Sequence, residues 1–191
     1  MKYIYILASL PLLLLTLSCS AENNTNNSAT VVKLINTFLS KQVTLKKNAS
    51  PSFKLGDFNG DGLEDIAVLF TPISKPIESA QIKVSTPWIY PSTIQSKKYH
   101  KSLAVFQSAG GDWLSDKTRI FIMLDTSGVL ETPSFKLLVS NKSDKDYKEH
   151  KNMLPVKTNN DLIILPTEAG IDTYIYWDKG TYNLFEPEEM P

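Results

Sequence analysis

The sequence predicts an α+β domain in which an N-terminal helix packs on a mainly antiparallel β-sheet. Between Val31 and Leu39 the apolar residues recur every three or four positions, as on one face of a helix. After Pro51 the apolar period shortens to two. Short segments rich in β-branched and aromatic residues follow, which is typical of strands. One helix followed by a series of strands indicates the α+β class.

The helix is expected to begin at Ala29, with Ser28 as its N-cap, because a serine hydroxyl can accept a hydrogen bond from an amide of the first turn. It should end between residues 41 and 45. Its buried face carries Val31, Leu34, Ile35, Phe38 and Leu39.

The strands are expected where the β-forming residues concentrate. The last two should form a hairpin around the turn signal Asp178-Lys179-Gly180. Residues 71–100 carry four prolines and lack a clear period, and residues 141–152 are a mixed-charge segment predicted as a solvated loop. The predicted strands cover residues 53–55, 66–70, 103–106, 119–124, 135–139, 162–165, 173–177 and 182–185.

Residues 1–18 are predicted to be a secretory signal peptide. Lys2 gives a positive start, residues 3–17 are almost wholly apolar, and small residues follow. The apolar run is shorter than the roughly 20 residues that a membrane-spanning helix needs. We therefore expect an exported protein.

Cys19 is the only cysteine, so no disulfide can form within the chain. Residues 16–19 resemble the lipobox of bacterial lipoproteins, with Thr16 where that family prefers leucine. The resemblance implies a diacylated Cys19 that anchors the protein stably to a membrane. The alternative is signal-peptidase cleavage after Ala21, which would discard Cys19.

After lipidation, Ser20 would be the second residue of the mature chain. In Gram-negative lipoproteins an aspartate at this position favours the inner membrane, so Ser20 implies the outer membrane, facing the periplasm. A Gram-positive envelope and the inner membrane are the alternatives. Residues 19–28 lack bulky apolar side chains and are expected to form a lipidated flexible tether. Residues 29–191 should form a single domain.

The clearest functional signal is the segment of residues 57–65, Asp-Phe-Asn-Gly-Asp-Gly-Leu-Glu-Asp. Oxygen-bearing side chains stand at its positions 1, 3, 5 and 9 and glycine at position 6, which is the spacing of a calcium loop. Calcium takes roughly six to eight oxygen ligands at short range, so one segment must wrap closely around it. The predicted ligands are Asp57, Asn59, Asp61, the Leu63 carbonyl and Asp65.

This segment is not an EF-hand, because position 12 of such a loop would be Val68, inside a predicted strand, instead of a bidentate glutamate. Residues 53–70 instead resemble the strand–loop–strand calcium site of FG-GAP repeats of the integrin α-like and VCBS type. The resemblance is to a single copy, without the Phe-Gly and Gly-Ala-Pro segment of the family. A glycine turn that binds no metal is the alternative.

The charge balance does not indicate a nucleic-acid partner, since the chain has 20 basic and 20 acidic residues. The two histidines, His100 and His150, lie in predicted loops, and neither a Gly-x-Ser-x-Gly nor a His-Glu-x-x-His motif is present. We therefore assign no catalytic residue and favour a protein that is not an enzyme.

Trp88 and Tyr90 lie between Pro87 and Pro91 and are the candidate partner-binding residues, because aromatic side chains in a stiffened loop are typical of binding hot spots. The alternative is that they pack back onto the sheet. We expect a calcium-binding, lipid-anchored envelope protein that binds a protein or glycan partner, as an immunity or inhibitor protein does. An envelope hydrolase with an unrecognised site is the alternative.

Overall fold

The computed structural model describes residues 20–43, 51–88, 101–125, 138–166 and 172–187. Within these ranges the chain forms two helices and nine strands. In chain order they are α1 (Ser20–Leu39), β1 (Ser52–Gly56), β2 (Asp65–Phe70), β3 (Ile82–Trp88), β4 (Ser102–Gln107), β5 (Arg119–Asp125), β6 (Leu138–Ser140), α2 (Tyr147–Met153), β7 (Leu162–Leu165), β8 (Thr173–Asp178) and β9 (Thr181–Phe185).

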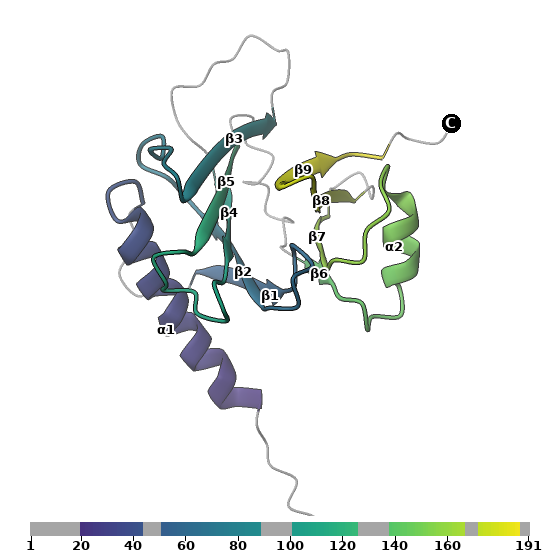
Figure 1. The fold of residues 1–191 in the computed structure, drawn as a ribbon, viewed down its shortest axis with the longest axis horizontal. Coiled ribbons are helices and arrows are strands. Elements are labelled where there is room, and N and C mark those ends of the chain that lie inside the picture. Colours follow the sequence, from purple (N-terminus) through teal and green to yellow (C-terminus); the bar gives the residue numbers. More distant parts are fainter. Residues whose placement is uncertain (1–19, 44–50, 89–100, 126–137, 167–171, 188–191) are drawn as a thin grey trace, which may run out of the picture.

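The strands form two sheets that lie between the two helices (Figure 1). The first sheet has the order β1-β2-β4-β5-β3 and the second the order β6-β7-β8-β9. The strand pairs are antiparallel except β3 and β5, which run parallel. The predicted α+β class is confirmed, but the strands divide between two sheets where the sequence predicted one.

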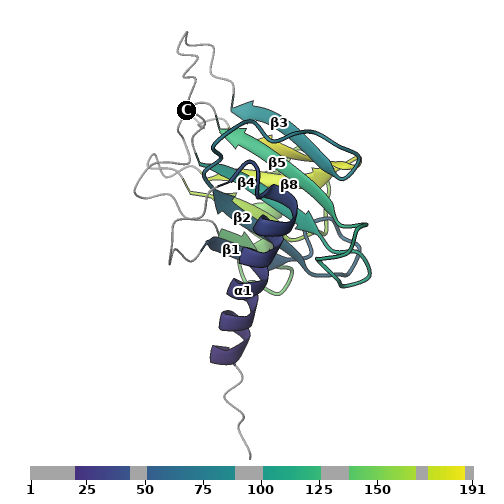
Figure 2. The same cartoon turned by 90° about the vertical axis from the view of Figure 1, so that its left-hand side faces the viewer.

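The first sheet is covered on both faces. All six residues of β4 are buried, and successive side chains of a strand point to opposite faces. Ala104 and Phe106 pack with the apolar face of α1, whereas Leu103 and Val105 pack with the second sheet. Figure 2 shows α1 lying across this sheet. A strand that is buried at every position needs this cover on both sides.

The second sheet is also buried on two faces. Ile163 and Leu165 of β7 point to the first sheet, and Leu162 and Ile164 point to the side covered by α2. Tyr147 of α2 is buried on that side. The molecule therefore has four layers in the order α1, first sheet, second sheet, α2 (Figure 1).

The helix α1 begins earlier than predicted. Its first residue is Ser20, so Ser28 lies inside the helix and is not an N-cap. Residues 20–28, predicted as a flexible tether, are helical, because each residue added to an existing helix gains a hydrogen bond at little further cost. Cys19 and the signal segment lie outside the described residues. Among the helices that are described, none is long and apolar enough to cross a membrane.

Two elements occupy segments in which the sequence predicted no regular structure. β3 lies within residues 71–100 and pairs in parallel with β5. α2 lies within residues 141–152 and just beyond, so the prediction of a solvated loop there is wrong for its second half. Tyr147 is its one buried residue, and a single buried position leaves no periodic signal.

Candidate functional site

The predicted calcium loop connects β1 to β2 and is docked on the segment that leads into β7. The backbone N–H of Asp57 donates to Asp161 Oδ2 at 2.8 Å, and the N–H of Asp161 donates back to the Asp57 carbonyl at 2.9 Å. Asp161 is buried. This reciprocal pair ties the loop of the first sheet to the second sheet.

Side-chain oxygens inside the loop accept hydrogen bonds from its own backbone. Asp57 Oδ1 accepts from the Gly60 N–H at 2.8 Å, and Asn59 Oδ1 accepts from the Asp61 N–H at 2.9 Å. Asp61 Oδ1 accepts from the Leu63 N–H at 2.8 Å. These are the local turns that aspartate and asparagine favour. They wind residues 57–63 into successive bends.

Two glycines allow those bends. Gly60 has φ 79° and Gly62 has φ 83°, in the left-handed region that other residues rarely adopt. A Cβ at Gly60 would also clash with Asn160 Oδ1, whereas a Cβ at Gly62 would meet open space. Gly60 therefore lies close to Asn160, in the segment that leads into β7, and Gly62 faces outward.

Asp65 begins β2 and is fully buried. Its Oδ2 accepts from the Phe58 N–H and its Oδ1 from the Ser108 N–H, both at 3.2 Å. Burial raises the pKa of Asp65 to about 7, against the lowering effect of the Ser108 N–H, and the negative charge of Asp61 adds to the rise. Burial and the neighbouring loop carboxylates thus both disfavour the ionised form of Asp65.

Lys142 brings a positive charge to the loop from the second sheet. Its Nζ lies 3.0 Å from Asp57 Oδ2, and its backbone N–H donates to Asp161 Oδ1 at 3.1 Å. Neither Lys142 nor Asp161 was a predicted site residue. Both are far from the loop in the sequence, and no local pattern linked them to it.

The donor chemistry of the loop suits calcium, because the predicted ligands are all oxygen atoms and calcium prefers oxygen. The structure brings Asn59 and Asp61 together, with Asn59 Nδ2 donating to Asp61 Oδ2 at 2.9 Å, whereas the Asp57 oxygens contact the Gly60 N–H and Lys142 Nζ. Within the described ranges, however, no three His, Cys, Asp or Glu side chains are gathered so that they could hold a metal ion. The carboxylate oxygens instead accept from backbone amides and from Lys142.

Of the other predicted site residues, Trp88 lies within the described ranges. Trp88 is the last residue of β3 and stands opposite Asp125 of β5. Tyr90 and Cys19 lie outside the described residues. His150, which was not a predicted site residue and was expected in a loop, belongs to α2 instead, where its ring meets Tyr174 edge-on with 5.7 Å between the ring centroids.

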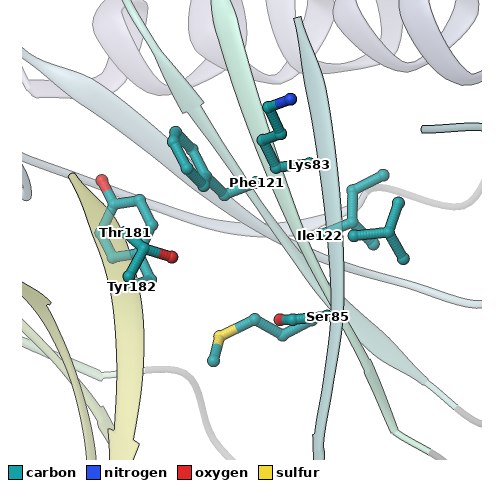
Figure 3. A pocket seen from close by; sticks show the side chains of 8 residues that line it. Lys83, Ser85, Phe121, Ile122, Thr181 and Tyr182 are labelled. Atoms are coloured by element: carbon teal, nitrogen blue, oxygen red, sulfur yellow. The ribbon is translucent and has the colours of Figure 1, made fainter. Parts of the chain in front are cut away.

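A small cavity lies between the edge of the first sheet and β9 (Figure 3). Its volume is about 90 Å³, well below the several hundred Å³ of usual small-molecule sites. Tyr182 lines it, packs edge-on against Phe121, and its hydroxyl accepts a hydrogen bond from Gln107 Nε2 at 3.0 Å. Burial raises the pKa of Tyr182 well above its usual value. We therefore interpret this cavity as a packing gap between the sheets.

The resemblance to the FG-GAP calcium loop rests on residues 53–70 alone. Those residues do adopt the expected strand, loop and strand. β1 and β2 are paired from Gly56 opposite Asp65 to Ser52 opposite Leu69. No family model, no curated protein and no solved structure matches the chain.

Proposed function

We propose that the protein is a lipid-anchored cell-envelope protein that binds one calcium ion in the β1–β2 loop and acts as a non-catalytic binding module. The observation that carries the calcium proposal is the ligand spacing of residues 57–65 in a loop between two paired strands. Asp57, Asn59, Asp61, the Leu63 carbonyl and Asp65 would hold the ion.

The calcium ion is proposed to be structural. Three carboxylates, an amide and a carbonyl would fill most of the roughly six to eight positions around calcium, which leaves little room for a substrate oxygen. The loop is also anchored to the hydrophobic core by Phe58, whose side chain is only 1% exposed. The ion would neutralise the loop's carboxylates and stabilise the junction between the two sheets, where Asp57 meets Asp161.

Calorimetric titration of the purified protein with calcium tests this proposal. We expect one site with a dissociation constant of about 10⁻⁴ to 10⁻³ M, the range of extracellular calcium modules. Asp61→Ala should abolish the binding heat. Asp116→Ala, which removes an exposed carboxylate from another loop, should leave it unchanged. If the wild-type protein gives no heat at millimolar calcium and its melting temperature is the same in EDTA, the proposal is wrong.

The partner is proposed to be a protein or glycan of the envelope that contacts the region around Trp88 and Tyr90. The proline-flanked aromatic pair supports this choice. A pull-down from envelope extract with the wild type and with the double variant Trp88→Ala/Tyr90→Ala tests it. A partner retained equally by both proteins would show that the contact lies elsewhere.

A further inference from the structure

The backbone of Lys142 is anchored beside the calcium loop, and this places the ammonium group of its side chain next to Asp57. Lys142 follows β6, and its N–H donates to Asp161 Oδ1, the same carboxylate whose other oxygen accepts from the Asp57 N–H. The side chain then reaches Asp57 Oδ2 at 3.0 Å. Because Asp161 fixes both backbones, the lysine approaches the loop in a defined place.

The environment of this pair differs from that of an ordinary surface ion pair. The Asp57 side chain is 16% exposed and that of Lys142 is 48% exposed, so the carboxylate is well shielded and the ammonium only half. Asp61 and Asp65 lie on the same loop and Asp161 lies beside it. Lys142 therefore counters a local excess of negative charge.

Asp57 is also the first ligand of the proposed calcium site. One of its oxygens accepts from the Gly60 N–H inside the loop, and the other contacts Lys142. A calcium ion ligated by Asp57 would lie a few ångströms from the ammonium. Two cations on one carboxylate repel each other. If the lysine stays on its oxygen, this repulsion weakens calcium binding. If the lysine swings away, calcium binding costs the ion pair between Lys142 and Asp57.

We propose that Lys142 is the built-in counterion of the calcium loop, which neutralises Asp57 in the absence of calcium and sets the calcium affinity low. This inference rests on the proposed calcium site. Lys142 would lower the calcium affinity without itself contacting the ion. It also links calcium binding to the segment between β6 and α2, because the ion and that segment compete for one carboxylate.

The test is a calcium titration of four full-length proteins, read by calorimetry. Lys142→Met removes the charge and keeps most of the stem, and we expect it to bind calcium about three- to tenfold more tightly than the wild type. Lys142→Arg keeps the charge and should stay within about twofold of the wild type. The control is Lys145→Met, which removes an exposed lysine from the same segment and should also leave the affinity unchanged.

Thermal unfolding gives an independent readout. In EDTA, Lys142→Met should melt at a lower temperature than the wild type, because Asp57 loses its counterion. Saturating calcium should raise its melting temperature by more than it raises that of the wild type. Lys142→Gln serves as a second neutral variant if Lys142→Met does not fold, as judged by circular dichroism.

The outcomes separate the two proposals. If the wild type binds calcium and the neutral variants bind with equal or weaker affinity, Lys142 is not a competing counterion and this inference fails alone. If Lys145→Met tightens calcium binding as much as Lys142→Met, the change in affinity reflects the net charge of the protein and not the Lys142–Asp57 pair, and the inference also fails. If none of the four proteins binds calcium, the proposed calcium site fails and the inference fails with it.

Discussion

Gly56, the last residue of β1, lies where the loop leaves the core. A Cβ at this position would be 2.7 Å from the ring of Phe58 and 3.1 Å from Asp161 Oδ2. Both neighbours are buried, and Phe58 is among the largest fully buried side chains. The absence of a side chain at Gly56 therefore allows the loop to turn against the second sheet.

We predict that Gly56→Ala lowers the free energy of unfolding by about 1–3 kcal/mol, the usual cost of overpacking a filled site. Urea unfolding in EDTA measures it. In a Phe58→Leu background the same substitution should cost clearly less, because the ring that it strikes is gone. Equal costs in both backgrounds would mean that the Phe58 ring does not limit the space at Gly56.

At the scale of elements, the β8–β9 hairpin shows how a turn is set by two residues. Lys179 has φ 48° and Gly180 has φ 85°, so both central residues of the turn are left-handed, as in a type I′ turn. Glycine tolerates this conformation at no steric cost, but lysine does not. Lys179 is thus a strained position in a turn that was correctly predicted.

We predict that Lys179→Asn stabilises the protein by about 0.5–1 kcal/mol, because asparagine tolerates the left-handed region and Asn-Gly is the preferred type I′ pair. A rise in melting temperature checks this. Lys179 pairs with Asp178 at 3.8 Å on the surface, an interaction too exposed to offset the gain. The matched control is Lys179→Gln, which removes the same charge without the conformational benefit. A gain of equal size in that control would point to charge as the cause.

At the scale of the whole molecule, α1 sets the relation between the domain and its proposed anchor. The C-terminal part of α1 is buried on the first sheet through Leu34, Ile35 and Leu39. The N-terminal part continues beyond the sheets (Figure 1, purple). A lipid on Cys19 would therefore join the chain one residue before a helix, and the helix, in place of a flexible tether, would hold the sheets away from the membrane.

We predict that palmitate labels the wild-type protein in its native host and does not label Cys19→Ala, because Cys19 is the only thiol. The substituted protein should leave the membrane fraction, since a diacyl anchor supplies most of the membrane affinity. Thr25→Ala, outside the lipobox-like segment, is a control that keeps the cysteine and should retain the label. Labelling of Cys19→Ala to the same extent would refute the anchor.

The division of the strands between two sheets could not be predicted from the sequence. In β4 and β7 every residue is buried, so the apolar pattern does not mark one face as the core side. The sequence correctly placed the described strands β2, β4, β5, β7, β8 and β9, because their composition is local. It missed β3, whose proline-containing segment is a strand only because β5 lies beside it.

The sequence by itself determined those features that a few neighbouring residues encode: the apolar face of α1, most strands, the β8–β9 turn, and the bends of residues 57–63. The hydrogen bonds that form these bends join residues two or three positions apart. Only the tertiary structure decided what surrounds that loop. Asp161 and Lys142 meet Asp57 across separations of 104 and 85 residues. Such contacts depend on how the two sheets pack, and no local spacing in the chain records that packing.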